Sequence, residues 1–469
     1  MSAAPIRFGT SGWRGVIADD FTFAGVRLAA AAIARHLRAR HRQAKVLVAY
    51  DTRFFSEEFG RAAARVLSCE GVGVLLAERA TPTPAVSFEI RGRGLQGGVN
   101  FTASHNPAEY NGLKFSGADG APADREQSAE IERIAAELAA RGWEPRAGDD
   151  ARPAETVDPR PTYLEGLDHL VRFDLIRKGK MALAYDAMHG AGAGWLDRAL
   201  VERGIPVRVL HAERNVLFGG HAPDPSPDHL GSLVPALREG SAGLGLATDG
   251  DADRFGILDA GGRFLSPNHF LGLAYDYLVR SRGWRLGVVR SVATSHLVDA
   301  VARHHRLPVY QTPVGFKYIG PYVLEDRVAL GGEESAGLSI RGHIPEKDGI
   351  LACLLAAEMA AEGGPLGAQL RELFRRIGAE FWPVRLNVPL TAAASERLAG
   401  WMKSDPEEFL GRRVRRTDRT DGLQLEFEDG SWLLVRPSGT EPLSRIYAEA
   451  GSPRLASRLA EETKQWILS

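Results

Sequence analysis

Short runs of consecutive apolar residues recur along this chain. Residues 45–51 (KVLVAYD) and 180–186 (KMALAYD) are nearly the same string, and residues 286–292 (LGVVRSV) are a weaker third copy. Continuous apolar character is typical of a strand that is buried on both faces of a sheet. Each copy is followed by a helix-like stretch and a second strand that ends in a polar loop, at residues 102–107, 249–254 and 331–337. The pattern predicts one α/β unit used three times, although all βαβ proteins are somewhat repetitive.

The pattern changes towards the end of the chain. Residues 423–427 and 431–436 flank a Glu-Asp-Gly turn, which is typical of a β-hairpin. A strand is expected at residues 381–390, a helix at 391–402 and a closing helix at 453–467. This segment is predicted to form a separate α+β domain.

Three stretches have the composition of domain boundaries. Residues 145–161 are rich in Pro, Asp and Ala, residues 259–262 (DAGG) have the composition of a turn, and the third boundary falls between residues 363 and 381. The predicted domains span residues 1–153, 154–256, 257–375 and 376–469, the first three α/β and the last α+β.

Composition narrows the class of protein. The chain has 469 residues and a formal net charge of -1, which argues against nucleic acid or an anionic membrane as the main partner. Its two cysteines, Cys69 and Cys353, are too few for a disulfide framework. No signal peptide is expected, and the most apolar helical stretch, residues 350–361, is too short to span a bilayer. We therefore expect a cytoplasmic protein.

The first polar loop contains a serine in the sequence Thr-Ala-Ser-His-Asn-Pro, directly after the strand-like residues 97–101. Asn106-Pro107 favours a turn, which would hold Ser104 at the apex of the loop. A serine takes part in group transfer when a base activates it or when it is already phosphorylated. Lys114 follows closely and could act as acid, base or phosphate contact. The alternative is an ordinary turn with a solvated serine.

The second polar loop carries three alternating carboxylates, Asp249, Asp251 and Asp253, after the strand-like residues 244–248. On extended chain such residues share one face, and three converging carboxylates suit Mg²⁺. An EF-hand is excluded because Arg254 stands where its glycine would be and Ala260 where its glutamate would be. A solvated acidic loop remains the alternative.

Charge links these two loops. Three carboxylates and one Mg²⁺ leave a net charge of about -1, and a phosphoserine would add roughly -2. Such a site needs cations, and Arg254, Arg14 and Lys114 are the candidates.

Two further motifs could hold a substrate. Residues 436–442 (RPSGTEP) combine an arginine, hydroxyls and a glycine, as expected of an anion-binding loop, to which Arg445 could add a charge. The alternative is the polar end of a hairpin. Residues 331–337 could bind sugar hydroxyls or could simply begin a helix.

Lys347 could titrate near a bound hydroxyl if it is desolvated, or could lie in a solvated turn. The arginine run at 412–419 is expected to be a solvated face or part of a funnel for phosphate, and not a nucleic-acid site.

His304 and His305 have no partner at metal-ligand spacing and are expected at the surface.

Together these motifs resemble the α-D-phosphohexomutase superfamily, and most of all its phosphoglucomutases and phosphomannomutases. Residues 8–15 (FGTSGWRG) resemble its N-terminal signature and residues 102–107 its phosphoserine loop. Residues 249–254 resemble its metal loop, 333–335 its sugar loop and 436–442 its phosphate loop. The resemblance spans the whole chain.

The resemblance implies an α/β fold of three similar domains with mixed sheets, plus the α+β domain, around a central cleft. Phosphoserine at Ser104 would exchange its phosphoryl group with a hexose monophosphate through a hexose 1,6-bisphosphate, with glucose 1,6-bisphosphate as activator. Mg²⁺ would be bound by Ser104, Asp249, Asp251 and Asp253.

The implied catalytic residues are Ser104, Arg14, Lys114, Lys347 and His105. The implied substrate-binding residues are Arg254, Gly315, Lys317, Glu333, Ser335, Arg436, Ser438, Gly439, Thr440 and Arg445. The expected partner is a hexose phosphate, without nucleic acid or membrane, and the protein is expected to be a monomer or small homo-oligomer.

The sugar is harder to predict. Glu-Glu-Ser at 333–335 resembles phosphoglucomutases, and Ala336 and Gly337 stand where related mutases carry histidine, so Lys347 could take that role. Contacts to O3 and O4 do not distinguish glucose from mannose, so a phosphomannomutase or dual enzyme stays open, and a phosphoglucosamine mutase is a weaker alternative. A phosphatase with an aspartyl nucleophile and a non-catalytic sugar-phosphate binder are remote alternatives.

Overall fold

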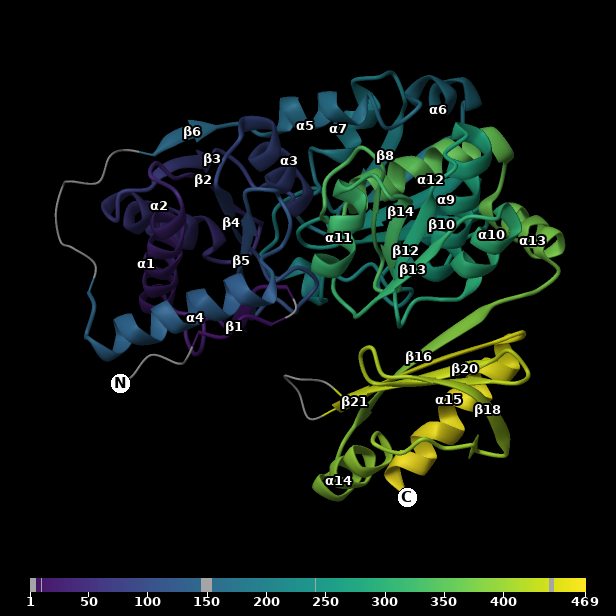
Figure 1. Ribbon diagram of the computed structural model, residues 1–469. Helices are drawn as coiled ribbons and strands as arrows, with labels where there is room; N and C mark the ends of the chain where they lie inside the picture. The colour runs from purple at the N-terminus through teal and green to yellow at the C-terminus, as the bar shows by residue number, and fades with distance from the viewer. Residues whose placement is uncertain (1–5, 10, 145–153, 241, 438–442) are drawn as a thin grey trace. The chain divides into compact units, whose positions relative to one another are not determined.

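A computed structural model describes residues 6–9, 11–144, 154–240, 242–437 and 443–469. The chain forms two compact units, whose helices and strands are labelled in Figure 1. The first consists of residues Met1–Pro267 and Gly315–Ala368, and the second of Asn268–Val314 and Gln369–Ser469.

The first unit begins with a six-stranded mixed sheet in the order β1-β5-β4-β2-β3-β6. Its strands are β1 Trp13–Val16, β2 Lys45–Tyr50, β3 Gly73–Ala77, β4 Gly97–Phe101, β5 Tyr110–Gly117 and β6 Glu155–Val157. Strand β2 pairs in parallel with β3 and β4, whereas β5 is antiparallel to β4 and β1. Its helices are α1 Phe23–Arg40, α2 Ser56–Cys69, α3 Thr83–Arg93 and α4 Arg125–Ala140.

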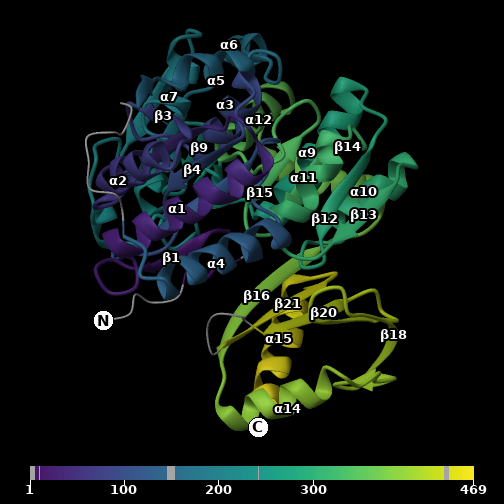
Figure 2. The ribbon, with the colours of Figure 1, turned by 60° about the vertical axis from the view of Figure 1, so that its left-hand side comes forward.

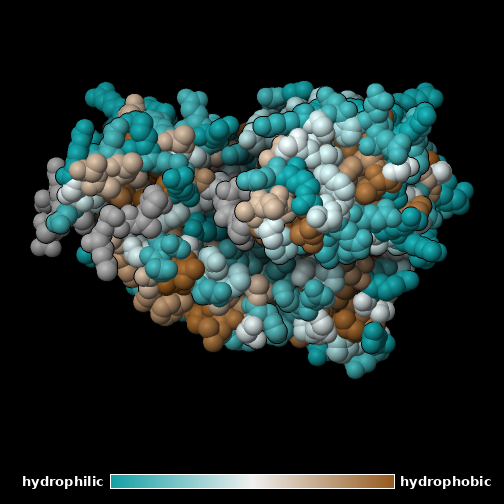
Figure 3. Space-filling view, turned by 90° about the horizontal axis from the view of Figure 1, so that it is seen from below, coloured by the Kyte–Doolittle hydropathy of each residue, from teal (hydrophilic) through white to brown (hydrophobic). Residues whose placement is uncertain are grey.

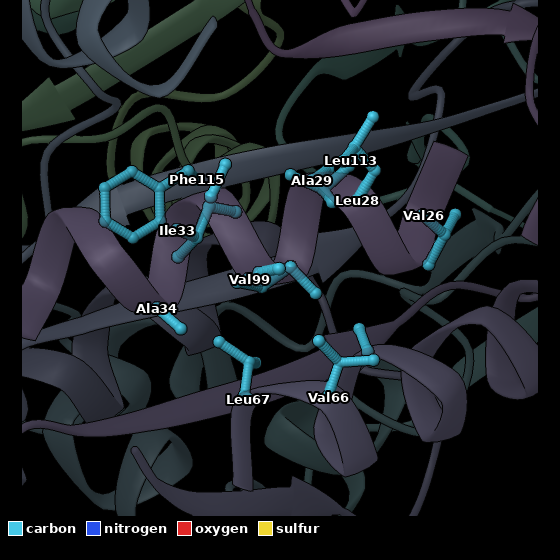
Figure 4. Close-up of a cluster of buried hydrophobic side chains, with 14 of the residues drawn as sticks. Val26, Leu28, Ala29, Ile33, Ala34, Val66, Leu67, Val99, Leu113 and Phe115 are labelled. Carbon is cyan, nitrogen blue, oxygen red and sulfur yellow. The ribbon is translucent and has the colours of Figure 1, made fainter. Parts of the chain in front are cut away.

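Alternation along β2 explains why helices cover both faces of this sheet. Val46 and Val48 belong to a core shared with α1, α2 and α4, and Leu47 and Ala49 belong to a second core shared with α3. Successive side chains of a strand point to opposite faces, so an unbroken apolar run needs cover on both sides. Figure 4 shows the first core, in which Ile33 of α1 lies close to Phe115 of β5.

The second sheet has the order β11-β10-β9-β7-β8 and repeats the same plan. Its strands are β7 Leu183–Asp186, β8 Val207–Leu210, β9 Leu244–Thr248, β10 Phe255–Asp259 and β11 Arg263–Phe264. Strand β7 pairs in parallel with β8 and β9, as β2 does with β3 and β4, and β10 is antiparallel to β9. Its helices are α5 Arg160–Leu167, α6 Phe173–Gly179, α7 Leu196–Val201 and α8 Val234–Arg238, with short 3₁₀ turns at Phe218–Gly220 and Gly231–Leu233.

The first unit also contains α11 Phe316–Leu324, the hairpin of β14 Val328–Glu333 and β15 Gly337–Ile340, and α12 Gly349–Gly363. Helix α12 packs against β9, β10 and α6, and its residues 349–360 are buried. In the part of the chain that the structure describes, no single helix is long and apolar enough to cross a membrane. Only the bent pair of α12 and α13 (Leu366–Ile377) passes that test, by length and composition alone.

The three predicted repeats are confirmed in one important respect. The three polar loops follow β4, β9 and β14, and each leads into an antiparallel neighbour, β5, β10 or β15. The third loop is shorter than predicted, because residues 331–333 belong to β14 and residue 337 begins β15.

The second unit combines α9 Pro267–Arg282, β12 Gly287–Ser291, α10 Leu297–His305 and β13 Val309–Thr312 with the end of the chain. Its antiparallel sheet has the order β16-β21-β20-β19-β18-β17. The strands are β16 Trp382–Pro389, β17 Glu408–Phe409, β18 Arg412–Asp418, β19 Leu423–Phe427, β20 Trp432–Pro437 and β21 Leu443–Ala450.

Helices α14 (Ala392–Trp401) and α15 (Pro453–Leu468) share a core with this sheet (Figure 2). The predicted hairpin and both predicted helices of this segment are confirmed, with bounds within a residue or two. Figure 3 shows hydrophilic side chains over most of one face of the protein, with smaller hydrophobic areas between them.

Candidate active site

Ser104 lies in the connection between β4 and β5, with its backbone in the left-handed region at φ 53°. This conformation is uncommon for a residue other than glycine and needs support from its surroundings. The Ser104 N–H donates to Thr102 Oγ1 at 2.9 Å, and the Asn106 N–H donates to the Ala103 carbonyl at 3.1 Å. The Ser104 side chain is buried, and its hydroxyl donates to Asp249 Oδ2 at 2.6 Å.

The acidic loop is a tight turn between β9 and β10, not the extended segment that the sequence suggested. Ala252 is left-handed at φ 56°, and its N–H donates to the Asp249 carbonyl at 3.0 Å. A Cβ on Gly250 would lie 2.4 Å from the Ser104 carbonyl oxygen, so only glycine lets the two loops touch here. The turn brings ligand oxygens of Asp249, Asp251 and Asp253 within 4.8 Å of one another.

The carboxylates of this triad fit a hard cation. Asp251 Oδ1 and Asp253 Oδ1 are buried and accept no hydrogen bond, although buried polar atoms are almost always paired. Both oxygens of Asp249 are used, by the Ser104 hydroxyl and by the Arg254 N–H at 3.0 Å. Burial and the charges of Asp251 and Asp253 raise the pKa of Asp249 well above its usual range, as expected where carboxylates converge.

Two lysines face the same carboxylates. Lys114 Nζ of β5 lies 2.6 Å from Asp251 Oδ2 and 2.7 Å from Asp253 Oδ2, and Lys347 Nζ lies 3.0 Å from Asp253 Oδ2. Burial would lower the pKa of Lys347, but Asp253 and Glu346 outweigh it, so the pKa is raised. The lysines in turn overcome the effect of burial on Asp253 and lower the pKa of that carboxyl group.

Two arginines lie beside the serine and acidic loops. Arg14 of β1 donates to Asn106 Oδ1 at 2.6 Å, and Arg254 Nε lies 4.0 Å from Asp253 Oδ1. Burial and the neighbouring charge of Arg254 lower the pKa of Arg14 to about 10. Burial and both arginines also lower the pKa of His105, whose Nδ1 lies 3.3 Å from Ser104 Oγ. Guanidinium groups that repel each other in a buried site favour an anion between them.

The third loop places Glu333 at the end of β14, where Oε1 accepts the Gly315 N–H at 2.6 Å. Burial and the charge of Glu334 raise the pKa of Glu333 to about 7. A Cβ on Gly337 would lie 2.3 Å from Lys347 Cδ, so this glycine leaves room for the lysine stem.

Two other predicted substrate residues lie near this loop. Ser335 is half-buried in the turn after Glu333, and Lys317 lies in the first turn of α11.

The second unit contains the predicted phosphate loop. Ser438, Gly439 and Thr440 lie outside the described residues. Arg436 of β20 stands opposite Arg445 of β21 in the sheet register, and its Nε lies 2.9 Å from Asp421 Oδ2.

Two motifs, the arginine run and the histidine pair, were expected at the surface, and the structure agrees for the first but only in part for the second. Four arginines of the run at 412–419 pair with carboxylates, as a solvated face would: Arg412, Arg415, Arg416 and Arg419. His304 is exposed as expected. The surface expectation is wrong for His305, because its Nε2 lies 2.8 Å from the buried carboxylate of Asp276.

Two groups near the site were not expected from the sequence. Thr83, at the start of α3, donates its backbone N–H to the Asp251 carbonyl and its hydroxyl to Asp251 Oδ2. Arg53, in the loop that follows β2, donates to carbonyl groups of the serine loop. The only sequence signal for Arg53 is its place after the repeated KVLVAYD string.

Comparison with known proteins gives a consistent result. Four domain models match in order: phosphoglucomutase/phosphomannomutase alpha/beta/alpha domain I at residues 5–141, domain II at 161–262, domain III at 266–377 and the C-terminal domain at 386–465.

Three similar proteins have different names. A phosphoglucomutase/phosphomannomutase of Thermococcus kodakarensis is 29% identical over 457 residues, covering 97% of this chain and 96% of the relative. A protein of Methanothermobacter thermautotrophicus assigned as a phosphoglucosamine mutase is 31% identical, covering 99% and 98%. A crystal structure from Thermus thermophilus assigned as a phosphomannomutase is 36% identical, with a TM-score of 0.87 and full coverage of both chains.

Proposed function

Because this chain belongs to the phosphoglucomutase/phosphomannomutase family, we propose that it interconverts glucose 1-phosphate and glucose 6-phosphate through a phosphoserine at position 104. Its class as an isomerase that transfers a phosphoryl group within a hexose phosphate follows from the family. The choice of Ser104 rests on one observation. Its hydroxyl lies 2.6 Å from Asp249, beside two buried carboxylate oxygens that accept no hydrogen bond.

In the proposed reaction a phosphoryl group moves from Ser104 to the sugar, and the other phosphoryl group of the sugar returns to Ser104. The bond between phosphorus and Ser104 Oγ breaks, a bond forms to a free hydroxyl oxygen of the hexose monophosphate, and the proton of that hydroxyl ends on Ser104 Oγ. The bisphosphate then returns its other phosphoryl group to Ser104 by the reverse steps. Because its pKa is raised, Lys347 is protonated, and we assign it the role of the acid: it gives a proton to Ser104 Oγ as the phosphoryl group leaves and regains one from the sugar hydroxyl.

Electrostatics support this assignment of roles. Mg²⁺ held by Asp249, Asp251 and Asp253 would neutralise charge on the transferring phosphoryl oxygens. Arg14 and Arg254 supply two half-buried positive charges beside Ser104, as a phosphoryl group of charge near -2 requires.

The sugar proposal rests on the third loop. Glu333 and Ser335 are proposed to bind the hexose hydroxyls, with Gly315 and Lys317 beside them, and Arg436, Ser438, Gly439, Thr440 and Arg445 are proposed to hold the phosphate that is not transferred. Glucose 1,6-bisphosphate is proposed as the activator that restores phosphate to Ser104. Because similar proteins carry phosphomannomutase and phosphoglucosamine mutase names, a dual enzyme is the second candidate.

A side-by-side activity assay tests the proposal. Purified protein with Mg²⁺ and a trace of glucose 1,6-bisphosphate is given glucose 1-phosphate, mannose 1-phosphate or glucosamine 1-phosphate, and Ser104→Ala serves as control. We expect the highest kcat/KM on glucose 1-phosphate and none in the control. Equal rates on glucose and mannose would establish the dual enzyme, and an active Ser104→Ala protein would refute the serine mechanism.

A further inference from the structure

We propose that Arg53 is the positioning residue of the serine loop, holding Ser104 in the left-handed conformation that directs its hydroxyl to the acidic triad. This inference rests on the proposed function of Ser104 and adds a residue that neither the sequence motifs nor the chemistry above required.

Arg53 binds the backbone of the serine loop at four points. Its Nη2 donates to the carbonyl oxygens of Ser104 and Asn106, both at 2.6 Å. Its Nη1 donates to the carbonyls of Pro107 at 2.8 Å and Tyr110 at 3.0 Å. One planar guanidinium thus orients carbonyl groups along the loop from the serine to the start of β5.

The guanidinium is itself held in place. Its side chain is 0% exposed, its Nε lies 3.2 Å from Asp51 Oδ2 in an ion pair without a hydrogen bond, and its Cζ lies 4.9 Å from the centre of the Phe218 ring. Asp51 Oδ1 in turn accepts the Arg53 N–H at 2.9 Å and the Ser56 hydroxyl at 2.7 Å. A long side chain whose backbone N–H and guanidinium both have partners has little freedom to move. It can therefore fix the positions of the loop carbonyl groups that it binds.

The energetic reason lies in Ser104. A non-glycine residue in the left-handed region costs about 1–3 kcal/mol and persists only where neighbouring groups impose it. Arg53 donates a hydrogen bond to the Ser104 carbonyl itself, so the guanidinium orients the peptide plane that follows Ser104. Lysine cannot replace it, because an ammonium is a single point charge, whereas guanidinium presents separated donors in one plane.

A purely structural role is the competing explanation, since a buried ion pair often affects only folding. The chain contains a matched control for that role. Arg290 of β12 is also buried and holds both oxygens of Asp299 at 2.6 Å, with further bonds to Gln311 and to the Ser291 carbonyl. No described residue of the serine or acidic loops bonds to Arg290 in any of these interactions.

The experiment compares Arg53→Lys with Arg290→Lys. Ser104 is loaded by glucose 1,6-bisphosphate, and its phosphorylation is followed by intact-protein mass spectrometry, alongside kcat, KM and Tm. We expect Arg53→Lys to slow phosphorylation and lower kcat by roughly 100-fold, as expected for a reacting group misplaced by about 1 Å, with KM changed by less than about threefold. Arg290→Lys should have a lower Tm than the wild-type protein, whereas its Ser104 should be phosphorylated at the wild-type rate.

Two results would overturn the inference: phosphorylation of Arg53→Lys at the wild-type rate, or losses in both variants that simply follow Tm. If Arg53→Lys does not fold, Phe218→Leu removes the ring beside the guanidinium and keeps its hydrogen bonds. A slower phosphorylation in Phe218→Leu supports the inference and an unchanged rate contradicts it. If wild-type protein takes no phosphate on Ser104, the proposed function fails, whatever the variants do.

Discussion

Replacing Gly337 by alanine should disable the site through Lys347 and leave the fold intact. The new Cβ would lie 2.3 Å from Cδ and 2.7 Å from Cγ of Lys347, and no backbone atom is among its three nearest neighbours. Carbon atoms pack at about 3.5–4.0 Å, so the lysine stem must retreat by more than about 1 Å. Because the lysine stem is flexible, the Lys347 side chain should move while the backbone of β15 keeps its position.

The expected loss of activity can be calculated from the weakened ion pair between Lys347 and Asp253. Lys347 Nζ lies 3.0 Å from Asp253 Oδ2. At an effective dielectric constant of about 20, moving the charges from about 3 to about 5 Å removes roughly 2 kcal/mol of attraction. If all of it is lost in the transition state, kcat falls by about 30-fold, since each ~1.4 kcal/mol is tenfold.

The assay is steady-state mutase kinetics with Tm measured in parallel. Gly92→Ala is the matched control, because a Cβ at Gly92 in α3 meets nothing within 4 Å, and it should keep full activity. Lys347→Ala and the double variant Gly337→Ala/Lys347→Ala complete a double-mutant cycle. If the glycine acts through the lysine, the double variant is no slower than Lys347→Ala. Full activity of Gly337→Ala, or additive losses in the double variant, would refute the reasoning.

Three further predictions concern the same unit. Burial raises the pKa of Glu333 from 4.5 to about 7, so the folded state binds the extra proton and stability should fall as pH rises through that window. Glu333→Gln should remove this dependence and be more stable by up to roughly 3 kcal/mol at pH 8, which urea unfolding at pH 5 and pH 8 would show; equal pH profiles would contradict it. Mg²⁺ at about 100 times its Kd should stabilise the protein by about 2.7 kcal/mol relative to EDTA, as a rise in Tm. Asp251→Asn should greatly reduce the shift, so an unchanged shift would argue against the triad. Tyr163→Phe removes the hydroxyl that donates to buried Asp348 Oδ2 at 2.7 Å and should cost about 1.5–3 kcal/mol in urea unfolding; a loss below ~0.5 kcal/mol would show that His343 alone satisfies this oxygen.

Local pattern was enough to predict the strands and the polar loops of the candidate site. Residues 97–101 and 244–248 were expected as strands and form β4 and β9 with those bounds. Each is a short run whose side chains are buried on both faces of a sheet. Burial on both faces requires consecutive apolar residues, and these can be read directly from the sequence. Ser104 and the three aspartates follow directly from their place after these strands.

Contacts between distant segments were decided only by the tertiary structure. Ser104 and Asp249 are 145 positions apart, and Lys114 and Asp253 are 139 apart, yet both pairs are in hydrogen-bond contact. The turn at Ala252 that converges the carboxylates was also missed, because an alanine gives no sign of a left-handed backbone.

Arg53 shows the physical reason most clearly. Its neighbours in sequence mark only the end of a strand, whereas its four acceptors lie 51 to 57 positions away. Side-chain periodicity encodes which face of an element is buried, so it specifies helices, strands and their ends. Which donor meets which acceptor depends on how whole sheets and helices pack, and that packing is a property of the folded chain as a whole.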